Sequence, residues 1–367
     1  MTGLAADVGR LPEYPGVTAA ARERAGRLLL RYPAVSLHDH PVRLPDPLTA
    51  QTWQGWLADG REQLGYAGLR ASGWAAVTAS ALARPGLPEV LAWARFLRAD
   101  MLANPGDAVF AADAGGIAAG ADRPVAILLG LEDLGSIGED LSGLEQLQDA
   151  GIRCAGIAYN AGNALGGGLA SEPDTGLTRL GRQAVRLMND LGLVVDVAHV
   201  GDVTSADVCR VSRAPVVVSH AGARAVWPTP RMKPDSVLAA VAGTGGVVAV
   251  EAAPQTTVSA AHSRHSLESV MDHLTYLADR IGIDHVALGP DTFFGDHVGL
   301  YRAGGHATAW ETPPHEDVDY VAGLENPGET ARNVTAWLVE HGWAETEIAK
   351  IIGGNVLRVL KDVTHRA

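Results

Sequence analysis

The chain has few cysteines, a deficit of basic residues and no long apolar run, and each shortage excludes a class of protein. Its two cysteines, Cys154 and Cys209, cannot form a disulfide framework, so we expect a reducing compartment. The 29 basic residues against 42 acidic ones give a formal net charge of −13, which argues against a nucleic-acid partner. No apolar run reaches about eighteen residues and no signal-peptide pattern opens the chain. We therefore predict a cytoplasmic protein without a membrane partner.

The rest of the composition is typical of a globular protein with a large core. Hydrophobic residues make up 47% of the sequence and charged residues 19%. The 43 glycines suit a fold with many tight turns between strands and helices. Because no linker of the kind that separates domains occurs, we expect one domain over residues 1–367. A helical extension at about 1–34 would precede the body, and closing helices at about 326–360 would complete it.

The most informative stretch is residues 193–221, LVVDVAHVGDVTSADVCRVSRAPVVVSHA. Two short, β-branched runs flank a segment with a helix start at Asp202 and a stop before Pro215. Runs that are apolar on both faces are typical of parallel strands covered by helices. Each run ends in a histidine, His199 or His220. Two successive parallel strands would therefore place two imidazoles at the same edge of a sheet.

Similar apolar segments alternate with helical segments along the whole chain. The expected strands are residues 35–42, 74–80, 124–133, 151–160, 193–200, 215–221, 245–253 and 284–291. This alternation predicts an α/β protein with a (β/α)8 TIM-like barrel, whose active site lies at the carboxyl ends of the strands. Residues 45–72 are interpreted as an irregular insertion or lid, and residues 293–323 as a covering loop.

Histidines and carboxylates gather at the expected strand ends. In VSLHDHPV, side chains two apart share one face, so His38 and His40 point together and Asp39 points away as a structural residue. Glu251, near the end of its expected strand, could face the site but is interpreted as structural. Each member of the set would be weak evidence alone, but together they indicate one site: His38, His40, Glu132, His199, His220 and Asp291.

This donor set suits two zinc ions, because neutral imidazoles and carboxylates are zinc ligands and a carboxylate can bridge two ions. We predict that Glu132 is shared by both ions, one completed by His38 and His40 and the other by His199 and His220. Two ions can share a hydroxide nucleophile and polarise a carbonyl oxygen. Asp291 would then move the proton from water to the leaving nitrogen. The fold expected is thus a barrel of the metal-dependent hydrolase type.

The sequence resembles the membrane (renal) dipeptidases, zinc metallopeptidases on an amidohydrolase-like barrel. The resemblance runs from about residue 122 to 360, with HDHP as a fainter match upstream. It is found in GLEDLGSIGEDLSGLEQLQDAGIRCAGIAYNAGN, LTRLGRQAVRLMNDLGLVVDVAHV, PVVVSHAGARAVWPTPRMKPD, DHVALGPDTFFG and IIGGNVLRVL. It implies that Glu132 bridges two zinc ions, that Asp291 is the catalytic acid/base and that Arg231 binds the terminal carboxylate of the substrate. The family often forms homodimers, which makes a homodimer an expectation here.

Two positions depart from the family pattern. The family's first motif is His-x-Asp, whereas His40 stands in the place of that aspartate. The family's fourth strand motif ends in His-Asn, whereas this chain has Tyr159 and Asn160, which we expect to contact the substrate. A phenol can still donate a hydrogen bond to an oxyanion.

We predict a zinc-dependent hydrolase that cleaves the amide bond of a dipeptide or a small N-acyl amino acid through a metal-bridging hydroxide. The alternative is a metal-dependent hydrolase of another bond, such as a lactam, a lactone or a modified peptide of secondary metabolism. A third reading, from a different class, is a binding protein that has lost catalysis.

Overall fold

The architecture is a closed barrel of eight parallel strands. The computed structural model describes residues 3–5, 12–60, 62–82, 86–120, 123–303 and 312–364. Strand pairing runs in the order β4-β2-β11-β10-β9-β8-β7-β6, and a β4–β6 pairing closes the ring. The barrel strands are β2 (Val35–Asp39), β4 (Ala76–Ala81), β6 (Val125–Leu131), β7 (Ile152–Gly156), β8 (Val194–Asp196), β9 (Val216–Ala221), β10 (Val247–Val250) and β11 (Val286–Leu288). The predicted (β/α)8 barrel is confirmed.

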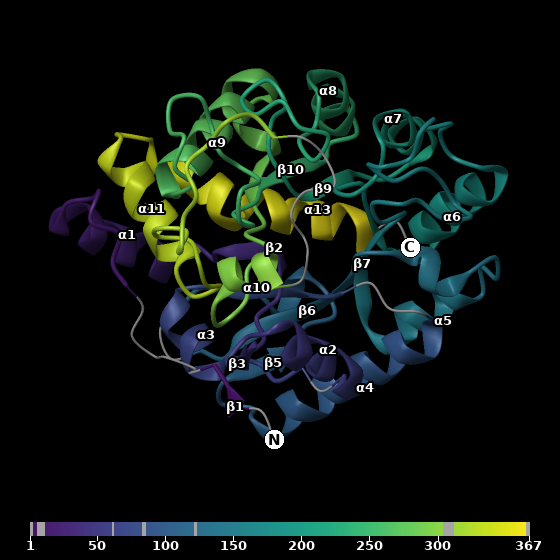
Figure 1. The fold of residues 1–367 in the computed structure, drawn as a ribbon, viewed down its shortest axis with the longest axis horizontal. Helices are drawn as coiled ribbons and strands as arrows, with labels where there is room; N and C mark the ends of the chain where they lie inside the picture. Colours follow the sequence, from purple (N-terminus) through teal and green to yellow (C-terminus); the bar gives the residue numbers. More distant parts are fainter. Residues whose placement is uncertain are drawn as a thin grey trace.

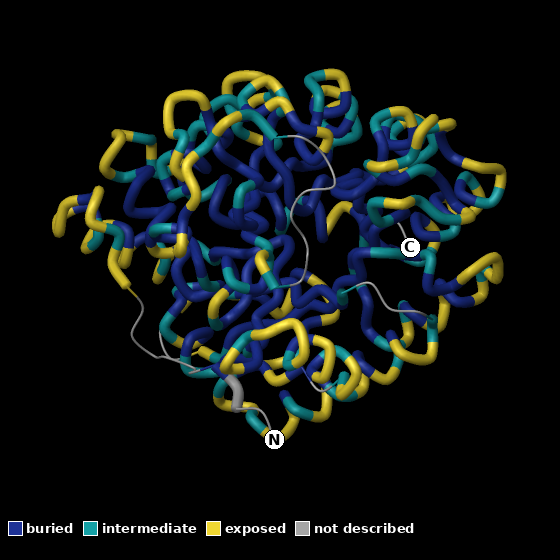
Figure 2. Tube along the Cα trace, viewed as in Figure 1, coloured by how far each residue is buried: buried dark blue, intermediate teal, exposed yellow. Residues whose placement is uncertain are grey.

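Helices cover the outside of the barrel (Figure 1). Those that follow the strands in sequence are α4 (Leu87–Ala103), α5 (Gly143–Ala150), α6 (Arg179–Asp190), α7 (Asp202–Val211), α8 (Asp235–Gly243) and α9 (Leu267–Ile281). The strands are buried almost throughout because their residues are apolar on both faces. Exposed residues lie on the outer turns of the helices and on the loops (Figure 2).

Helices from the two ends of the chain pack together. The helix α1 (Ala19–Arg31) lies against α11 (Thr330–Glu340). The C-terminal segment continues through α12 (Glu345–Ala349), a π-helical turn at Lys350–Gly354 and α13 (Asn355–Thr364). A short antiparallel pair, β1 (Gly3–Leu4) and β3 (Pro45–Asp46), lies apart from the barrel. Within the described residues, none of the helices combines the length and the apolar character needed to cross a membrane.

The expectation of an irregular segment at 45–72 is wrong. This segment contains the helices α2 (Ala50–Asp59) and α3 (Tyr66–Ser72). Thr49 and Thr52 form a reciprocal capping box at the start of α2, and Gly60 ends it in the left-handed conformation. The buried tryptophans of α2 anchor it on the body, which is why a segment rich in turn residues still folds as a helix.

Two further elements were not predicted. The strand β5 (Ala108–Phe110) pairs in parallel with β6 outside the ring. The helix α10 (His297–Ala303) occupies part of the expected covering loop at 293–323. Residues 304–311 of that loop lie outside the described residues.

Candidate metal centre and active site

The histidines and carboxylates predicted at strand ends meet at the carboxyl end of the barrel. His38 lies in β2, Glu132 directly follows β6 and His220 lies in β9. His199 and Asp291 each lie three residues beyond the ends of β8 and β11. Their ligand atoms form three overlapping groups whose atoms lie within 4.8 Å of one another: His38 with His40 and Glu132, Glu132 with His199 and His220, and His38 with His220 and Asp291.

The two oxygens of Glu132 face different histidines. Oε1 lies 3.2 Å from Nε2 of His40, and Oε2 lies 3.7 Å from Nε2 of His199. Nε2 of His199 in turn lies 3.0 Å from Nε2 of His220. Glu132 therefore stands between two groups of imidazoles, which is the arrangement expected of a bridging carboxylate.

Asp291 faces the first histidine group. Its Oδ1 lies 3.2 Å from Nε2 of His40 and 3.4 Å from Nε2 of His38. Its backbone has a φ of 57°, in the left-handed region that is uncommon for residues other than glycine. The backbone N–H of Asp291 donates to the carbonyl of His38 at 3.2 Å. The turn after β11 is thus tied to β2 and directs the carboxylate towards the histidines.

Hydrogen bonds to Nδ1 hold all four histidine rings. Ser80 contacts two of them: its hydroxyl lies 3.0 Å from Nδ1 of His38, and its carbonyl lies 3.0 Å from Nδ1 of His40. For His199 the partner is Oδ1 of Asn160 at 2.7 Å, and for His220 it is the hydroxyl of Ser219 at 2.7 Å. Because Nδ1 is occupied, Nε2 of each ring is left to face the centre, as in metal sites whose ligands are oriented by a second set of contacts.

The electrostatics favour cation binding. Burial lowers the pKa of His199 and of His220 well below the ordinary value, so both rings are neutral, the form that binds metals. Burial also lowers the pKa of His40, but hydrogen bonds to Asp291 and Glu132 outweigh this and raise that pKa to about 10. The paired carboxylates thus favour positive charge beside them.

Buried atoms whose contacts are with charged groups alone also fit a metal. Nε2 of His38 faces Oδ1 of Asp291 at 3.4 Å and Oε1 of Glu132 faces Nε2 of His40 at 3.2 Å, and neither contact has the geometry of a full hydrogen bond. Leaving buried polar atoms unsatisfied costs free energy unless a ligand satisfies them. The donor set of imidazoles and carboxylates therefore fits divalent ions of the zinc type.

A close backbone contact fixes the position of Glu132. A Cβ added to Gly156, at the end of β7, would lie 2.2 Å from the carbonyl oxygen of Glu132. Only glycine permits the end of β7 to approach the segment after β6 this closely. The glycine at this strand end therefore sets where the Glu132 carboxylate lies.

Tyr159 and Asn160 lie beside the second histidine group. The ring of Tyr159 stacks on that of His199, with centroids 4.1 Å apart. Burial and the nearby carboxylate of Glu132 raise the pKa of Tyr159, so the phenol keeps its proton. Tyr159 can therefore donate a hydrogen bond near the metal-ligating residues. Asn160 orients His199 in this structure.

Arg231 lies next to the second group and is paired with a carboxylate. Its guanidinium forms a buried ion pair with Glu251, at the end of β10, and donates to the carbonyls of His220 at 2.9 Å and Ala198 at 3.3 Å. The sequence suggested a structural role for Glu251 and gave no sign of this pairing. Ser80 was also missed, because a serine in an apolar strand has no distinctive sequence signal.

A small cavity opens onto the cluster. It measures about 60 Å³ and is lined by cluster residues together with aromatic and apolar ones from helices and loops, among them Trp53 of α2, Tyr301 of α10, Tyr159 and Phe293. The aromatic wall would exclude water from the reacting atoms.

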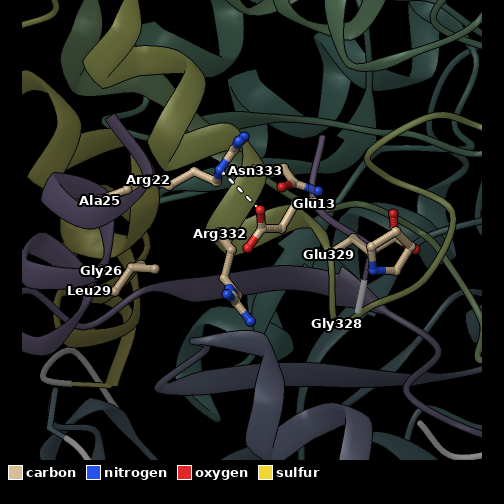
Figure 3. Close-up of a pocket in the computed structure, with 10 residues that line it drawn as sticks. Glu13, Arg22, Ala25, Gly26, Leu29, Gly328, Glu329, Arg332 and Asn333 are labelled. Carbon is tan, nitrogen blue, oxygen red and sulfur yellow. Dashed lines mark ion pairs between the residues drawn. The ribbon is translucent and has the colours of Figure 1, made fainter. Parts of the chain in front are cut away.

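A cavity elsewhere offers no comparable chemistry. It measures about 90 Å³ and lies between α1 and the start of α11 (Figure 3). Its polar lining includes the ion pair between Arg22 and Glu13, at 3.2 Å. The metal-ligating groups found among the described residues all lie at the barrel end instead.

The fold and this cluster define a barrel of the metal-dependent hydrolase type. The family described as membrane dipeptidase, peptidase family M19, matches residues 61–301 and 315–367. The chain belongs to this family.

Curated relatives agree with this assignment. The dipeptidase tcpJ of Claviceps purpurea is 33% identical over 240 residues, which are 65% of this chain and 51% of that protein. The dipeptidase aclJ of Aspergillus oryzae is 32% identical over 245 residues, which are 66% of this chain and 53% of that protein. The matched region thus spans about half the length of these relatives.

Solved structures share the fold. An amidohydrolase from Pseudomonas aeruginosa superposes with a TM-score of 0.75 at 20% identity, covering 92% of this chain and 98% of the other. A metallopeptidase from Rhodobacter sphaeroides, liganded with a phosphinate mimic of the dipeptide L-Ala-D-Ala, superposes with a TM-score of 0.67 at 22% identity. That match covers 91% of this chain and 99% of the other.

Proposed function

We propose that this protein is a zinc-dependent hydrolase that cleaves the amide bond of a dipeptide or a related small N-acyl amino acid. The observation that supports this most directly is the position of Glu132 between two histidine groups. Membership of a dipeptidase family gives the reaction class. A cytoplasmic location agrees with the two free cysteines.

Two zinc ions per chain would be held by five residues. One ion would bind His38, His40 and Glu132, and the other Glu132, His199 and His220. Bound there, the ions would polarise the substrate carbonyl and supply a nucleophile from water at neutral pH.

Asp291 would transfer a proton during the reaction, and Tyr159 would donate a hydrogen bond to the substrate. Hydrogen bonds from His38 and His40 outweigh burial and hold the pKa of Asp291 well below its ordinary value, so this carboxylate is ionised and can accept a proton. It would pass that proton to the leaving nitrogen. Tyr159, which keeps its proton, would donate to the oxyanion that develops on the substrate carbonyl.

A second candidate is hydrolysis of another bond, such as a lactam, a lactone or a modified peptide. Two features favour it: Tyr159 stands where the family has a histidine, and His40 where it has an aspartate. Both changes lie at the reacting centre, so they would alter which carbonyl is bound rather than whether water attacks it.

A substrate panel separates the two candidates. The zinc-loaded chain is incubated with dipeptides of both C-terminal stereochemistries and, in parallel, with lactams and lactones, and the products are quantified by chromatography. We expect release of amino acids from at least one dipeptide. Turnover confined to lactams or lactones would favour the second candidate. No turnover in the whole panel, with zinc present, would reject both and favour a binding protein.

A further inference from the structure

A buried carboxylate outside the metal-ligating set, Asp196, contacts both segments that carry the second histidine group. Asp196 is the last residue of β8 and is 4% exposed. Its Oδ1 accepts hydrogen bonds from the backbone N–H groups of Ala198 at 3.0 Å and Ser219 at 2.9 Å. Ala198 and Ser219 directly precede His199 and His220 in the chain. One carboxylate oxygen therefore ties together the two segments that supply these imidazoles.

The other oxygen of Asp196 begins a row of hydrogen bonds that ends at His220. Oδ2 accepts from the hydroxyl of Ser219 at 2.5 Å, and the same hydroxyl lies 2.7 Å from Nδ1 of His220. Ser219 is 1% exposed and His220 is fully buried, so bulk water cannot take the place of either partner. A carboxylate, a hydroxyl and an imidazole thus lie in sequence beside the metal-ligating cluster.

The direction of these hydrogen bonds determines which nitrogen of His220 carries the ring hydrogen. A hydroxyl has one hydrogen and can either donate to an imidazole nitrogen or accept from it. An ionised carboxylate only accepts, and the two backbone donors on Oδ1 favour the ionised form of Asp196. The hydrogen of Ser219 therefore goes to Asp196, and Nδ1 of His220 donates to Ser219. A neutral ring protonated at Nδ1 has its lone pair on Nε2, the atom that faces His199 at 3.0 Å.

Resting on the function proposed above, we propose that Asp196 is a positioning residue that acts through Ser219 to keep the metal-binding lone pair on Nε2 of His220. Without the carboxylate, the hydroxyl can donate to Nδ1, and the ring hydrogen then moves to Nε2, where it blocks a metal ion. In many metal sites a carboxylate fixes a histidine ligand by accepting from its other ring nitrogen. Here Ser219 lies between the two groups and transmits the effect of the charge.

Asp196→Asn reverses the direction of the row while keeping the shape of the side chain. The amide oxygen can still accept from both backbone N–H groups, but the amide nitrogen that replaces Oδ2 donates to Ser219. The hydroxyl then donates to Nδ1 of His220, so the ring hydrogen goes to Nε2. We expect zinc affinity at the second site to fall about 10–100-fold and affinity at the first site to stay unchanged. Zinc titration of the full chain against a chromophoric chelator measures both.

A second substitution identifies which site has changed. In His40→Ala, only the second site is expected to bind zinc tightly. Adding Asp196→Asn to this variant should lower the affinity of the one remaining ion by the same factor. An affinity that stays the same would place the effect of Asp196 outside the second site and overturn the proposal.

The ring of His220 itself separates this role from a merely structural one. Nitrogen-15 NMR of the metal-free full chain, labelled at histidine, distinguishes a ring protonated at Nδ1 from one protonated at Nε2, and the His220 signal is the one that His220→Gln removes. We expect protonation at Nδ1 in the wild type and at Nε2 in Asp196→Asn. A structural role would lower stability in urea unfolding and leave the ring hydrogen on Nδ1.

Ser219 and an exposed aspartate supply the remaining variants. Ser219→Ala removes the hydroxyl but keeps both backbone hydrogen bonds to Asp196, and it should lower second-site affinity as Asp196→Asn does. Ser219→Thr retains a hydroxyl and should restore that affinity. Asp279→Asn, the same chemical change at an exposed position of α9, should alter neither zinc affinity nor the ring of His220.

The outcomes separate this proposal from the proposed function. Unchanged second-site affinity, or an unchanged His220 ring, in Asp196→Asn would overturn the role of Asp196. If Asp196→Asn does not fold, equal second-site affinity in Ser219→Ala and the wild type would overturn it instead. If the wild type binds zinc but hydrolyses no amide, the proposed function fails and the zinc affinities still decide the role of Asp196. If the wild type binds no zinc, the ring of His220 in the metal-free chain decides it.

Discussion

At the scale of single residues, Glu132 lies between the two histidine groups of the site. Its two oxygens lie towards His40 and His199, which belong to different histidine groups. It is 5% exposed and follows a fully buried strand, so its charge cannot be satisfied by bulk water. A buried carboxylate at this position is stable only if positive charge lies beside it.

Glu132→Gln should therefore reduce both metal content and activity. The amide keeps the shape of the side chain but loses the charge, and it cannot present two anionic oxygens. Losing a residue that only orients a metal ligand lowers affinity or activity about 10–100-fold, so losing a shared ligand should lower kcat/KM by more than about a hundredfold. Elemental analysis and steady-state kinetics measure the two effects.

The matched control is Glu139→Gln, the same change at an exposed position in the segment that follows β6. It should leave metal content and kcat/KM unchanged. Full zinc content and full activity in Glu132→Gln would exclude Glu132 as a ligand.

His40 offers a second test at the residue scale. Its Nε2 lies 3.2 Å from both Glu132 and Asp291, where an aspartate would also serve as a ligand. We predict that His40→Asp keeps two zinc ions per chain, whereas His40→Ala keeps about one, because only the first site loses a donor. Zinc titration with a chromophoric chelator distinguishes them. Equal zinc content in His40→Ala and the wild type would show that His40 is not a ligand.

At the scale of elements, the buried His273 connects the helix α9 to the segments that follow β9 and β10. Nδ1 of His273 accepts from the backbone N–H of Ala223 at 2.9 Å, and Nε2 donates to the carbonyl of Val258 at 2.9 Å. Burial lowers the pKa of His273 to about 4 and that of His265 to about 3. Protonation of His273 at Nδ1 would remove an acceptor that the segment after β9 needs.

Stability should therefore fall as the pH drops from about 6.5 towards 4. The unfolded chain binds protons on these histidines over this range and the folded chain does not, so acid favours unfolding by about 1.4 kcal/mol per pH unit for each histidine. His273→Gln should flatten this slope by about that amount in urea unfolding, whereas His341→Gln, at an exposed histidine, should not. An unchanged slope in His273→Gln would mean that His273 titrates normally.

The sequence predicted strands better than it predicted the covering segments. The eight strands were predictable because residues apolar on both faces leave a clear pattern. The helix α2 was missed because proline, glycine and tryptophan around it suggested an irregular segment, whereas its capping threonines and buried tryptophans stabilise a helix. The strand β5 has three residues and was hidden in a glycine- and alanine-rich segment.

The candidate site was predictable in part, for a similar reason. Residues at the carboxyl ends of parallel strands must lie close together, so the sequence could bring His38, Glu132 and Asp291 to one place. It could not reveal that Arg231 meets Glu251, because the two residues lie 20 positions apart in segments whose side-chain directions only the folded barrel sets. The role of Ser80 towards two histidines was hidden in the same way.

At the scale of the whole molecule, the barrel brings donors from β2, β6, β8, β9 and β11 to one end. Parallel pairing around a closed ring requires every strand to end on the same side, so distant stretches of sequence can supply a single site. Helices around the ring and packing between α1 and α11 support this arrangement from outside (Figure 1). The site thus depends on ring closure as well as on its own residues.

The most direct test of this account is the zinc content of the chain, measured by elemental analysis on protein purified without chelators or nickel. We predict about two zinc ions per chain, since Glu132 stands between two histidine groups. About one ion or none, not restored by added zinc, would contradict a site bridged by Glu132 and with it the proposed hydrolysis.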